Sequence, residues 1–286
     1  MSTKTERIVS GALCTLALAA LLASPAVAQP PIPRGVDIFE TGSGTGTNVN
    51  FAANPIPAGF FCPGSAPFTG VVNLKGVPLA TAPAGAAGSA DTVVERLADG
   101  VFAGGVTSIP VVVRAMRLVS TSDIQVLCPT ATGTLQTTFW RVSTCLCGTQ
   151  PTSTLTLKVD QACGCGHANG RLDLRICLTF TRLDTGETRG PITQGISLAL
   201  ADMPWCPRPG VGQTVVETSF AVDTNCDNQP DRTLLGSKGF YPGWTCADLG
   251  VDCWTQYAHL THCHPNWTNP GAHEHCVNPV CGKRTN

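Results

Sequence analysis

Apolar and polar residues alternate with a period of two along several stretches of the chain. The clearest stretch is STLTLKV at 153–159, in which Leu155, Leu157 and Val159 alternate with polar residues. The segment RLDLRI at 171–176 has the same pattern. Because successive side chains of a strand point to opposite faces, this pattern predicts strands with one buried face and one solvated face.

Nine segments rich in Val, Ile, Thr and Phe are predicted to be strands, and helical periodicity is almost absent. Turn-forming residues separate them, and the sequences ANG at 168–170 and DTG at 184–186 are predicted to form hairpin turns or tight loops. Short strands divided by turns are typical of an all-β fold, here an antiparallel β-sandwich. The predicted strands are residues 71–74, 92–97, 106–118, 124–128, 134–142, 154–159, 172–183, 195–200 and 214–222.

The composition narrows the class of protein. Of the 286 residues, 43% are hydrophobic and 13% are charged, which favours a packed core and argues against a disordered chain or a coiled coil. The 18 Lys and Arg residues nearly balance the 19 Asp and Glu residues and form no long run. We therefore expect no basic surface and no binding of nucleic acid.

The first 28 residues have the features of a secretory signal peptide. Lys4 and Arg7 precede an apolar run over 12–23, and the segment ends in Ala26-Val27-Ala28. The run is shorter than the ~20 residues that span a bilayer, so a permanent membrane anchor is the weaker alternative. Cleavage after Ala28 would leave a soluble, secreted or periplasmic protein without a membrane anchor.

Fourteen cysteines follow the predicted signal peptide. An even number in an exported chain predicts up to seven disulfide bonds, and their connectivity stays open. The pairs Cys145-Cys147 and Cys163-Cys165, each with one residue between the two cysteines, would suggest a zinc site in a reducing compartment, but disulfides are favoured after export.

Cysteine density divides the chain, since only Cys62 lies between the leader and Cys128. The division predicts an N-terminal β-sandwich domain over 36–142, a cysteine-rich β-domain over 143–240 and a small Cys/His-rich C-terminal module over 241–286. A single large sandwich with a cysteine-stapled extension would give much the same pattern. Residues 80–90, rich in Ala and Gly, are expected to form a long surface loop.

Three N-terminal segments carry a resemblance to a protein family. They are PIPAGFF at 55–61, PFTGVV at 67–72 and DTVVERL at 91–97. Together they resemble a pattern of uncharacterised exported bacterial β-rich proteins, over about a third of the chain. The resemblance implies export and a β-fold, and it implies no activity.

Five of the six histidines lie within 259–275, in the sequences HLTHCH and HEHC. If residues 262–277 form a hairpin with its loop at 268–271, Cys263 faces Cys276 at a distance suited to a disulfide. The imidazoles then share the opposite face, where they could bind Zn or Cu. A solvated polar loop held by disulfides is the alternative. The predicted ligands are His262, His264, His273 and His275, with His259 as a further ligand.

A second candidate site is the sequence DTNCDNQPD at 223–231, which resembles the short Asp-rich calcium loops of thrombospondin-type and dockerin-type repeats. Loop positions 1, 3, 5 and 9 carry side-chain oxygens, as Ca²⁺ requires. Asn228 replaces the usual glycine at position 6, and position 12 is Leu234 instead of Glu. An ordinary turn between strands is the alternative. The predicted calcium ligands are Asp223, Asn225, Asp227 and Asp231.

No local catalytic motif is present, such as G-x-S-x-G, H-E-x-x-H or a P-loop. The sequence His262-Cys263-His264 resembles part of the copper motif of multicopper oxidases, but the other histidine motifs of that family are missing. We expect a secreted binding or structural protein whose partner is an extracellular ligand, glycan or protein. The rivals are a secreted metalloenzyme, either a hydrolase or a copper-type oxidase, and a carbohydrate-binding module. The module would need aligned, exposed aromatic residues from among Trp140, Trp205, Trp244, Trp254 and Trp267.

Overall fold

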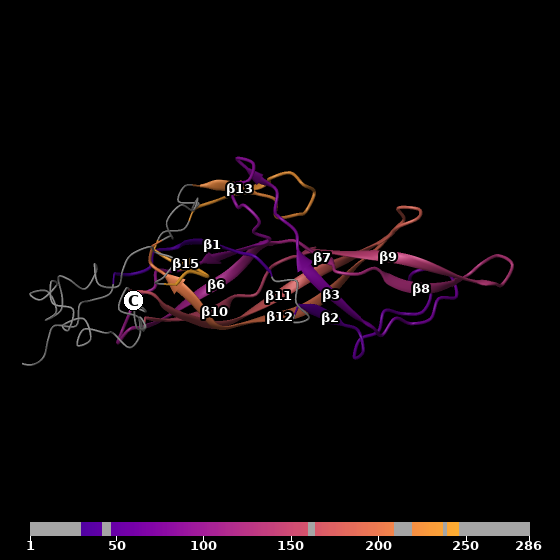
Figure 1. Cartoon of the computed structure of the whole chain (residues 1–286), viewed down its shortest axis with the longest axis horizontal. Helices are drawn as coiled ribbons and strands as arrows, with labels where there is room; N and C mark the ends of the chain where they lie inside the picture. Colours follow the sequence, from indigo (N-terminus) through magenta and orange to yellow (C-terminus); the bar gives the residue numbers. More distant parts are fainter. Residues whose placement is uncertain (1–29, 42–46, 160–163, 209–218, 237–238, 246–286) are drawn as a thin grey trace, which may run out of the picture. The chain divides into compact units, whose positions relative to one another are not determined.

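The computed structural model describes residues 30–41, 47–159, 164–208, 219–236 and 239–245, and these residues form an antiparallel, all-β fold (Figure 1). The described part contains no helix, and hence none that is long and apolar enough to cross a membrane. The strands are β1 (Gly35–Phe39), β2 (Asn48–Asn50), β3 (Val71–Gly76), β4 (Thr81–Ala82), β5 (Thr92–Arg96), β6 (Val106–Met116), β7 (Leu118–Ser120), β8 (Ile124–Pro129), β9 (Leu135–Leu146), β10 (Ser153–Val159), β11 (Gly166–Arg182), β12 (Thr188–Cys206), β13 (Phe220–Val222), β14 (Arg232–Leu234) and β15 (Tyr241–Pro242).

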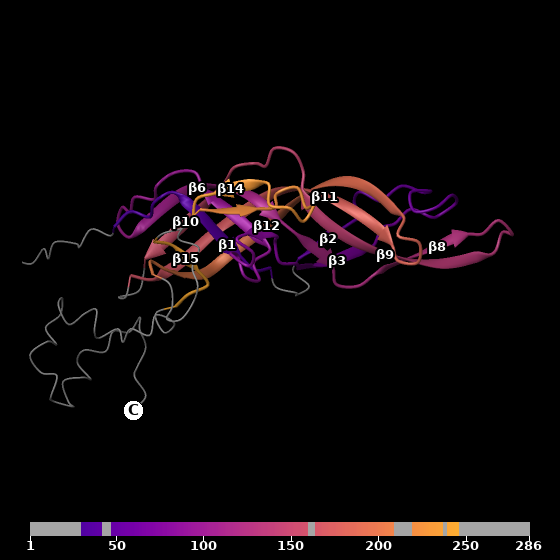
Figure 2. The same ribbon diagram turned by 90° about the horizontal axis from the view of Figure 1, so that it is seen from above.

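Twelve of these strands form one branched sheet, and β4, β13 and β14 form a separate three-stranded sheet. The long strand β11 organises the larger sheet because it pairs with three others. One edge of β11 pairs first with β10 and then with β9, while the other edge pairs with β12. Figure 2 shows β11 and β12 running side by side over most of their length. On β12, only Trp205 and Cys206 have a further strand partner among the described residues, which is β15.

The buried face of β11 follows directly from its alternating sequence. Leu172, Leu174, Ile176, Leu178 and Phe180 are all buried, and polar or half-buried residues lie between them. These side chains join one hydrophobic core that also includes residues from the N-terminal strands. The predicted alternation in β10 is confirmed in the same way, since Leu155 and Leu157 are buried and Val159 packs against the core.

Aromatic side chains fill the centre of this core. The Phe61 ring lies with its centroid 5.2 Å from that of Trp140 and 5.4 Å from that of Phe180. The contact with Phe180 is edge-to-face, an arrangement that aromatic rings prefer over a direct sandwich. Trp140 comes from β9 and Phe180 from β11, so Phe61 packs an N-terminal loop onto the later strands.

No break between sheets falls at the expected domain boundary of residues 142 and 143. Strand β9 runs through this position and pairs with β11 beyond it. Strands from both expected β-regions therefore share the larger sheet and one core. Residues 246–286, most of the expected C-terminal module, lie outside the described residues.

The predicted all-β, antiparallel and disulfide-rich fold is confirmed, and eight of the nine predicted strands overlap observed strands along their described length. The ninth, 214–222, overlaps β13 at its end, and residues 214–218 are outside the described part. The turn predicted at 184–186 joins β11 to β12, with Gly186 at a φ of 72°.

The turn predicted at 168–170 is wrong, because these residues lie inside β11. A bulge interrupts the pairing with β12 between Ala168 and Gly170. A Cβ atom at Gly170 would lie 2.7 Å from the carbonyl oxygen of Thr154 on β10. The glycine therefore permits a close approach of two backbones within the sheet, and it does not form a hairpin turn.

Candidate functional site

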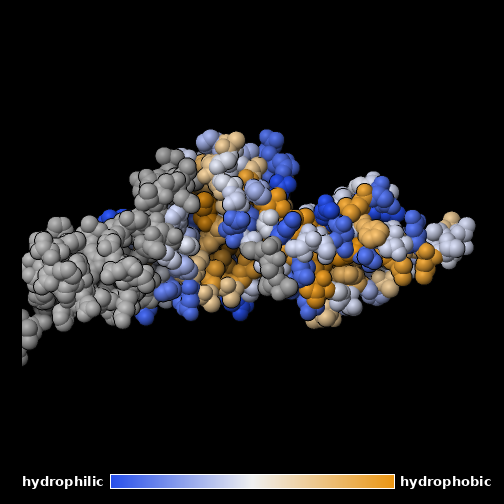
Figure 3. Space-filling view, viewed as in Figure 1, coloured by the Kyte–Doolittle hydropathy of each residue, from blue (hydrophilic) through white to orange (hydrophobic). Residues whose placement is uncertain are grey.

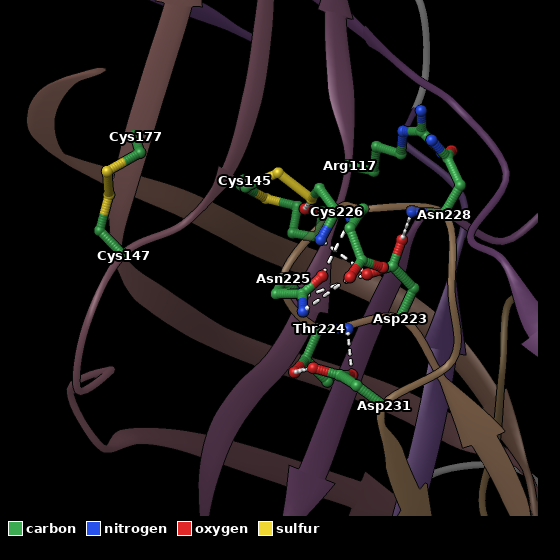
Figure 4. The surroundings of a disulfide bond; sticks show 12 residues. Arg117, Cys145, Cys147, Cys177, Asp223, Thr224, Asn225, Cys226, Asn228 and Asp231 are labelled. Atoms are coloured by element: carbon green, nitrogen blue, oxygen red, sulfur yellow. Dashed lines mark hydrogen bonds between the residues drawn. A yellow bond between two sulfur atoms is a disulfide. The ribbon is translucent and has the colours of Figure 1, made fainter. Parts of the chain in front are cut away.

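The predicted calcium loop connects β13 to β14 and is organised around the Asp223 side chain (Figure 4). Asp223 is buried, with 1% of its surface exposed. Its Oδ1 accepts hydrogen bonds from the backbone N–H groups of Asn225, at 3.2 Å, and Cys226, at 2.6 Å. Its Oδ2 accepts one from the N–H of Asn228, at 2.8 Å. Backbone donors thus surround the carboxylate, which satisfies a charged group that would otherwise be costly to bury.

The backbone of this loop twice enters the left-handed region. Cys226 has a φ of 65° and Asn228 a φ of 69°. Asn adopts this conformation more readily than most residues that carry a side chain. Asn228 therefore replaces the glycine of calcium loops without changing the backbone conformation expected there.

The other proposed calcium ligands lie on the same loop, but their oxygens bond to groups within it. Asp227 accepts hydrogen bonds from the Asn225 side chain and from the N–H of Gln229. Asp231 accepts two from Thr224, one from the N–H and one from the hydroxyl. Within the described residues, no group of three or more His, Cys, Asp or Glu side chains is arranged to hold a metal ion. The backbone and the types of donor thus suit a cation, whereas the carboxylates of Asp227 and Asp231 accept hydrogen bonds from groups within the loop.

A disulfide and a hydrogen bond attach this loop to the larger sheet (Figure 4). Cys226 is bonded to Cys145 on β9, with their Cα atoms 6.2 Å apart. Arg117 Nη1 donates to Asn228 Oδ1 at 2.5 Å. The neighbouring disulfide, Cys147–Cys177, joins the end of β9 to β11. The loop belongs to the small sheet by its backbone and is held on the large sheet by these bonds.

All eight cysteines among the described residues form disulfides, as the sequence predicts for an exported chain. Several disulfides together suggest an oxidising, extracellular environment. The sequence could not give their connectivity, because each bond joins residues at least 30 positions apart. The pairs are Cys62–Cys128, Cys145–Cys226, Cys147–Cys177 and Cys165–Cys206.

The predicted histidine site lies outside the described residues. This holds for His259, His262, His264, His273 and His275 and for the proposed pair Cys263 and Cys276. Of the tryptophans that a carbohydrate-binding platform would need, Trp140 and Trp205 are fully buried, Trp244 is half-buried, and Trp254 and Trp267 lie in the undescribed C-terminal segment.

The hairpin formed by β8 and β9 has an exposed apolar face that the sequence analysis did not identify. Leu127, Leu135 and Phe139 on the hairpin are 55%, 64% and 45% exposed, and Leu183 is 44% exposed. The Leu183 N–H donates to the Phe139 carbonyl oxygen at 2.9 Å, which places the two residues opposite each other. Figure 3 shows apolar surface over the part of the molecule that carries this hairpin. In the sequence of β8, apolar residues occupy odd as well as even positions, as in IQVLC at 124–128. This pattern is the sequence signal for apolar side chains on both faces of the strand.

A cavity of about 620 Å³ lies where the 83–90 loop meets β1, β12 and β15. Residues 85–90 of the expected surface loop at 80–90 form one of its walls, whereas Thr81 and Ala82 form β4. Two exposed residues of the lining are joined, since the Ser89 hydroxyl donates to Glu40 Oε2 at 2.8 Å. The walls are otherwise apolar or small, and they include Ile38, Phe39, Ala86, Met203 and Pro242.

Comparison of the chain with protein-family models, with curated proteins and with solved structures found no match in any of the three.

Proposed function

We propose that this chain is a secreted, disulfide-stabilised binding module of the cell envelope or the extracellular space, and that its partner is a protein. The apolar face of the β8–β9 hairpin carries the proposal. Large exposed apolar side chains gathered on one face are typical of interaction sites. The face offers aliphatic side chains and a single aromatic ring, Phe139, which favours a protein over a glycan.

The bracing of the hairpin supports this role. Cys128 on β8 forms a disulfide with Cys62. The residue before Cys62 in the sequence, Phe61, packs in the core. Trp140 on β9 is fully buried and its indole N–H donates to the Thr138 hydroxyl at 2.9 Å. A surface held in this way loses little conformational entropy on binding, and preorganisation of this kind increases affinity.

Site-specific photo-crosslinking tests the proposal. A photoreactive residue at Thr137, which is exposed on the apolar face beside Leu127, should give a discrete protein adduct in the extracellular material of the source cells. The adduct should disappear when Leu127→Ser and Phe139→Ser are introduced together. The matched control carries the photoreactive group at Thr154, which is exposed on β10. An adduct that survives the double substitution, or equal labelling at Thr154, would refute this function.

Metal binding by the C-terminal histidines is a separate part of the proposal and is supported by their spacing in the sequence. We propose that His262, His264, His273 and His275, with His259, bind Zn or Cu. Elemental analysis of the mature protein should find about one equivalent of metal, lost in His264→Ala/His275→Ala. A metal-free protein from metal-replete, oxidising expression would exclude both this site and the rival metalloenzyme.

A further inference from the structure

The outer edge of β12 has no strand partner among the described residues from Ile192 to Leu200. Its inner edge is paired with β11 throughout this stretch. At an average rise of ~3.3 Å per residue, nine residues present an edge about 30 Å long. An edge of this length offers a row of unpaired backbone groups to another strand.

The pairing pattern of β11 shows which β12 groups point outward. The carbonyl oxygen of Arg175 accepts from the N–H of Cys147, and its own N–H donates to the Gln150 side chain. The N–H and C=O of Arg175 therefore point away from β12. Its partner Gly195 belongs to the same non-hydrogen-bonded pair, so the N–H and C=O of Gly195 point to the free edge of β12. The Asp173 N–H likewise donates to Ser153 on β10, which assigns the same direction to Ser197.

The edge lacks the features that usually prevent strand pairing. Natural edges carry charged residues, prolines or bulges, and β12 has Pro191 before this stretch and a bulge near Asp202 after it. Between them, from 192 to 200, no residue is charged. A Cβ atom at Gly195 would meet nothing within 4 Å, so the sheet face is open at this position.

One face of the edge is incompletely buried. Ile192, Ile196, Leu198 and Leu200 pack against the core, but each remains partly exposed. A strand added beside β12 would extend the sheet and cover the open flank of these side chains. Apolar residues on that face of the added strand would therefore be favoured.

We propose that the occupant is a second copy of this chain, whose β12 pairs antiparallel with the first across a two-fold axis at Ile196. In this register Ile192 faces Leu200 of the other copy, and Gly195 faces Ser197 in a hydrogen-bonded pair. Both residues of that pair are ones whose backbone groups point outward, so the register uses the free donors and acceptors.

Charge at the two ends of the edge favours this antiparallel arrangement. In this arrangement the end of β12 that carries Asp202 lies at the end of the other copy's β12 that carries Arg189. The Asp202 carboxylate has no ion-pair partner among the described residues, while Arg189 contacts Glu187 within its own chain. The two-fold axis creates this attraction twice, which a parallel pairing would not do.

Sedimentation velocity of the full mature chain over a range of concentrations tests the proposal. The wild-type protein should show a monomer–dimer equilibrium. Thr193→Lys/Ala199→Lys places like charges opposite each other across the axis and should raise the dimer dissociation constant by about tenfold or more. The matched control, Ala131→Lys/Thr132→Lys, adds the same charge in the β8–β9 loop and should leave the equilibrium unchanged.

A second measurement uses the wild-type protein and therefore does not depend on the folding of the variants. It also shows whether another part of the same chain covers the β12 edge. Amide hydrogen exchange at 193, 195, 197 and 199 should be slow in the dimer and fast when the wild-type protein is diluted to monomer. A protein that stays monomeric at high concentration would overturn the proposal. It would be overturned equally by slow exchange at these amides in the monomer, because another part of the same chain would then cover the edge.

Discussion

Cys145 lies directly opposite Cys177 in the β9–β11 pair, yet the two cysteines are bonded to different partners. Cys145 is joined to Cys226 in the Asp223 loop, and Cys177 is joined to Cys147. Opposed residues of an antiparallel pair have Cα atoms ~4.5–5.5 Å apart, which is within the range of a disulfide. The sheet therefore places a second possible partner beside each of these cysteines.

This arrangement predicts disulfide exchange in the variant Cys226→Ser. The released Cys145 thiolate should attack the sulfur of Cys177, form a Cys145–Cys177 bond and release Cys147 as a thiolate. Peptide mapping after alkylation of free thiols should find the label on Cys147. A label on Cys145 with an intact Cys147–Cys177 bond would contradict the prediction. The double variant Cys145→Ser/Cys226→Ser cannot exchange in this way and should lose ~2–4 kcal/mol of stability through the missing cross-link alone.

The strands could be predicted from the sequence where one face is buried and the other solvated. In β10 and the second half of β11, alternation gave the correct face of each residue. The turn predicted at 168–170, in the first half of β11, was wrong because a glycine that permits close backbone contact looks the same in sequence as one that forms a turn. Gly170 is such a residue.

The candidate site could be predicted only in those features that depend on residues close together in the sequence. The loop at 223–231 and the conformation of Asn228 follow from neighbouring residues. The attachment of this loop to Cys145 and Arg117 depends on how distant strands pair, and no local pattern encodes it. The same reason explains why the apolar face of the hairpin was not predicted, since Leu183 joins it from the turn that follows β11.

Because Arg96 and Asp37 form a buried ion pair, replacing one of them should strongly lower the free energy of unfolding. Both side chains are fully buried, with Arg96 Nε 3.0 Å from Asp37 Oδ2. Arg96 Nη1 also donates to the Pro33 carbonyl oxygen at 2.6 Å. Arg96→Leu leaves a buried carboxylate without this cation and should cost about 3–5 kcal/mol in the free energy of unfolding measured with urea. The exposed pair Arg141–Asp123 serves as the control.

Breaking that exposed pair with Arg141→Leu should cost about 1 kcal/mol or less, because solvent screens it. Replacing both buried partners, in Arg96→Met/Asp37→Leu, should recover part of the lost stability, since no lone charge remains buried. Equal costs for Arg96→Leu and Arg141→Leu would show that burial does not determine the strength of the inner pair.

The hydrogen bonds of Asp173 on β11 should make part of the stability of the protein depend on pH. A hydrogen bond from the Ser197 hydroxyl, and then one from Arg171, hold the pKa of Asp173 below its usual value. Ser197→Ala should therefore raise the pKa of Asp173, measured by NMR titration of its carboxyl carbon. Because the pKa is lowered in the folded state, the stabilisation is present above the ordinary pKa of about 3.9 and is lost as the pH falls through the folded value. An unchanged pKa in Ser197→Ala would remove the assigned cause.

If the loop at 223–231 binds calcium, as its sequence predicts, the melting temperature of the protein should be higher in the presence of the ion. Asp223, Asn225, Asp227 and Asp231 supply the oxygen donors that Ca²⁺ prefers, and the backbone conformation at Asn228 suits such a loop. At a calcium concentration ~100 times the dissociation constant, binding adds about 2.7 kcal/mol and should raise Tm by ~5 °C over the chelated protein.

Two variants separate calcium binding from the internal hydrogen bonds of the loop. Asp227→Asn removes one carboxylate charge and keeps an oxygen that can accept from Gln229, so it should abolish most of the calcium-dependent increase while changing the Tm of the chelated protein little. Asp184→Asn, in the β11–β12 turn, should retain the full increase. The loop acts only as a structural turn if chelation leaves the Tm of the wild-type protein unchanged, because hydrogen bonds from the backbone would then be all that the Asp223 carboxylate requires.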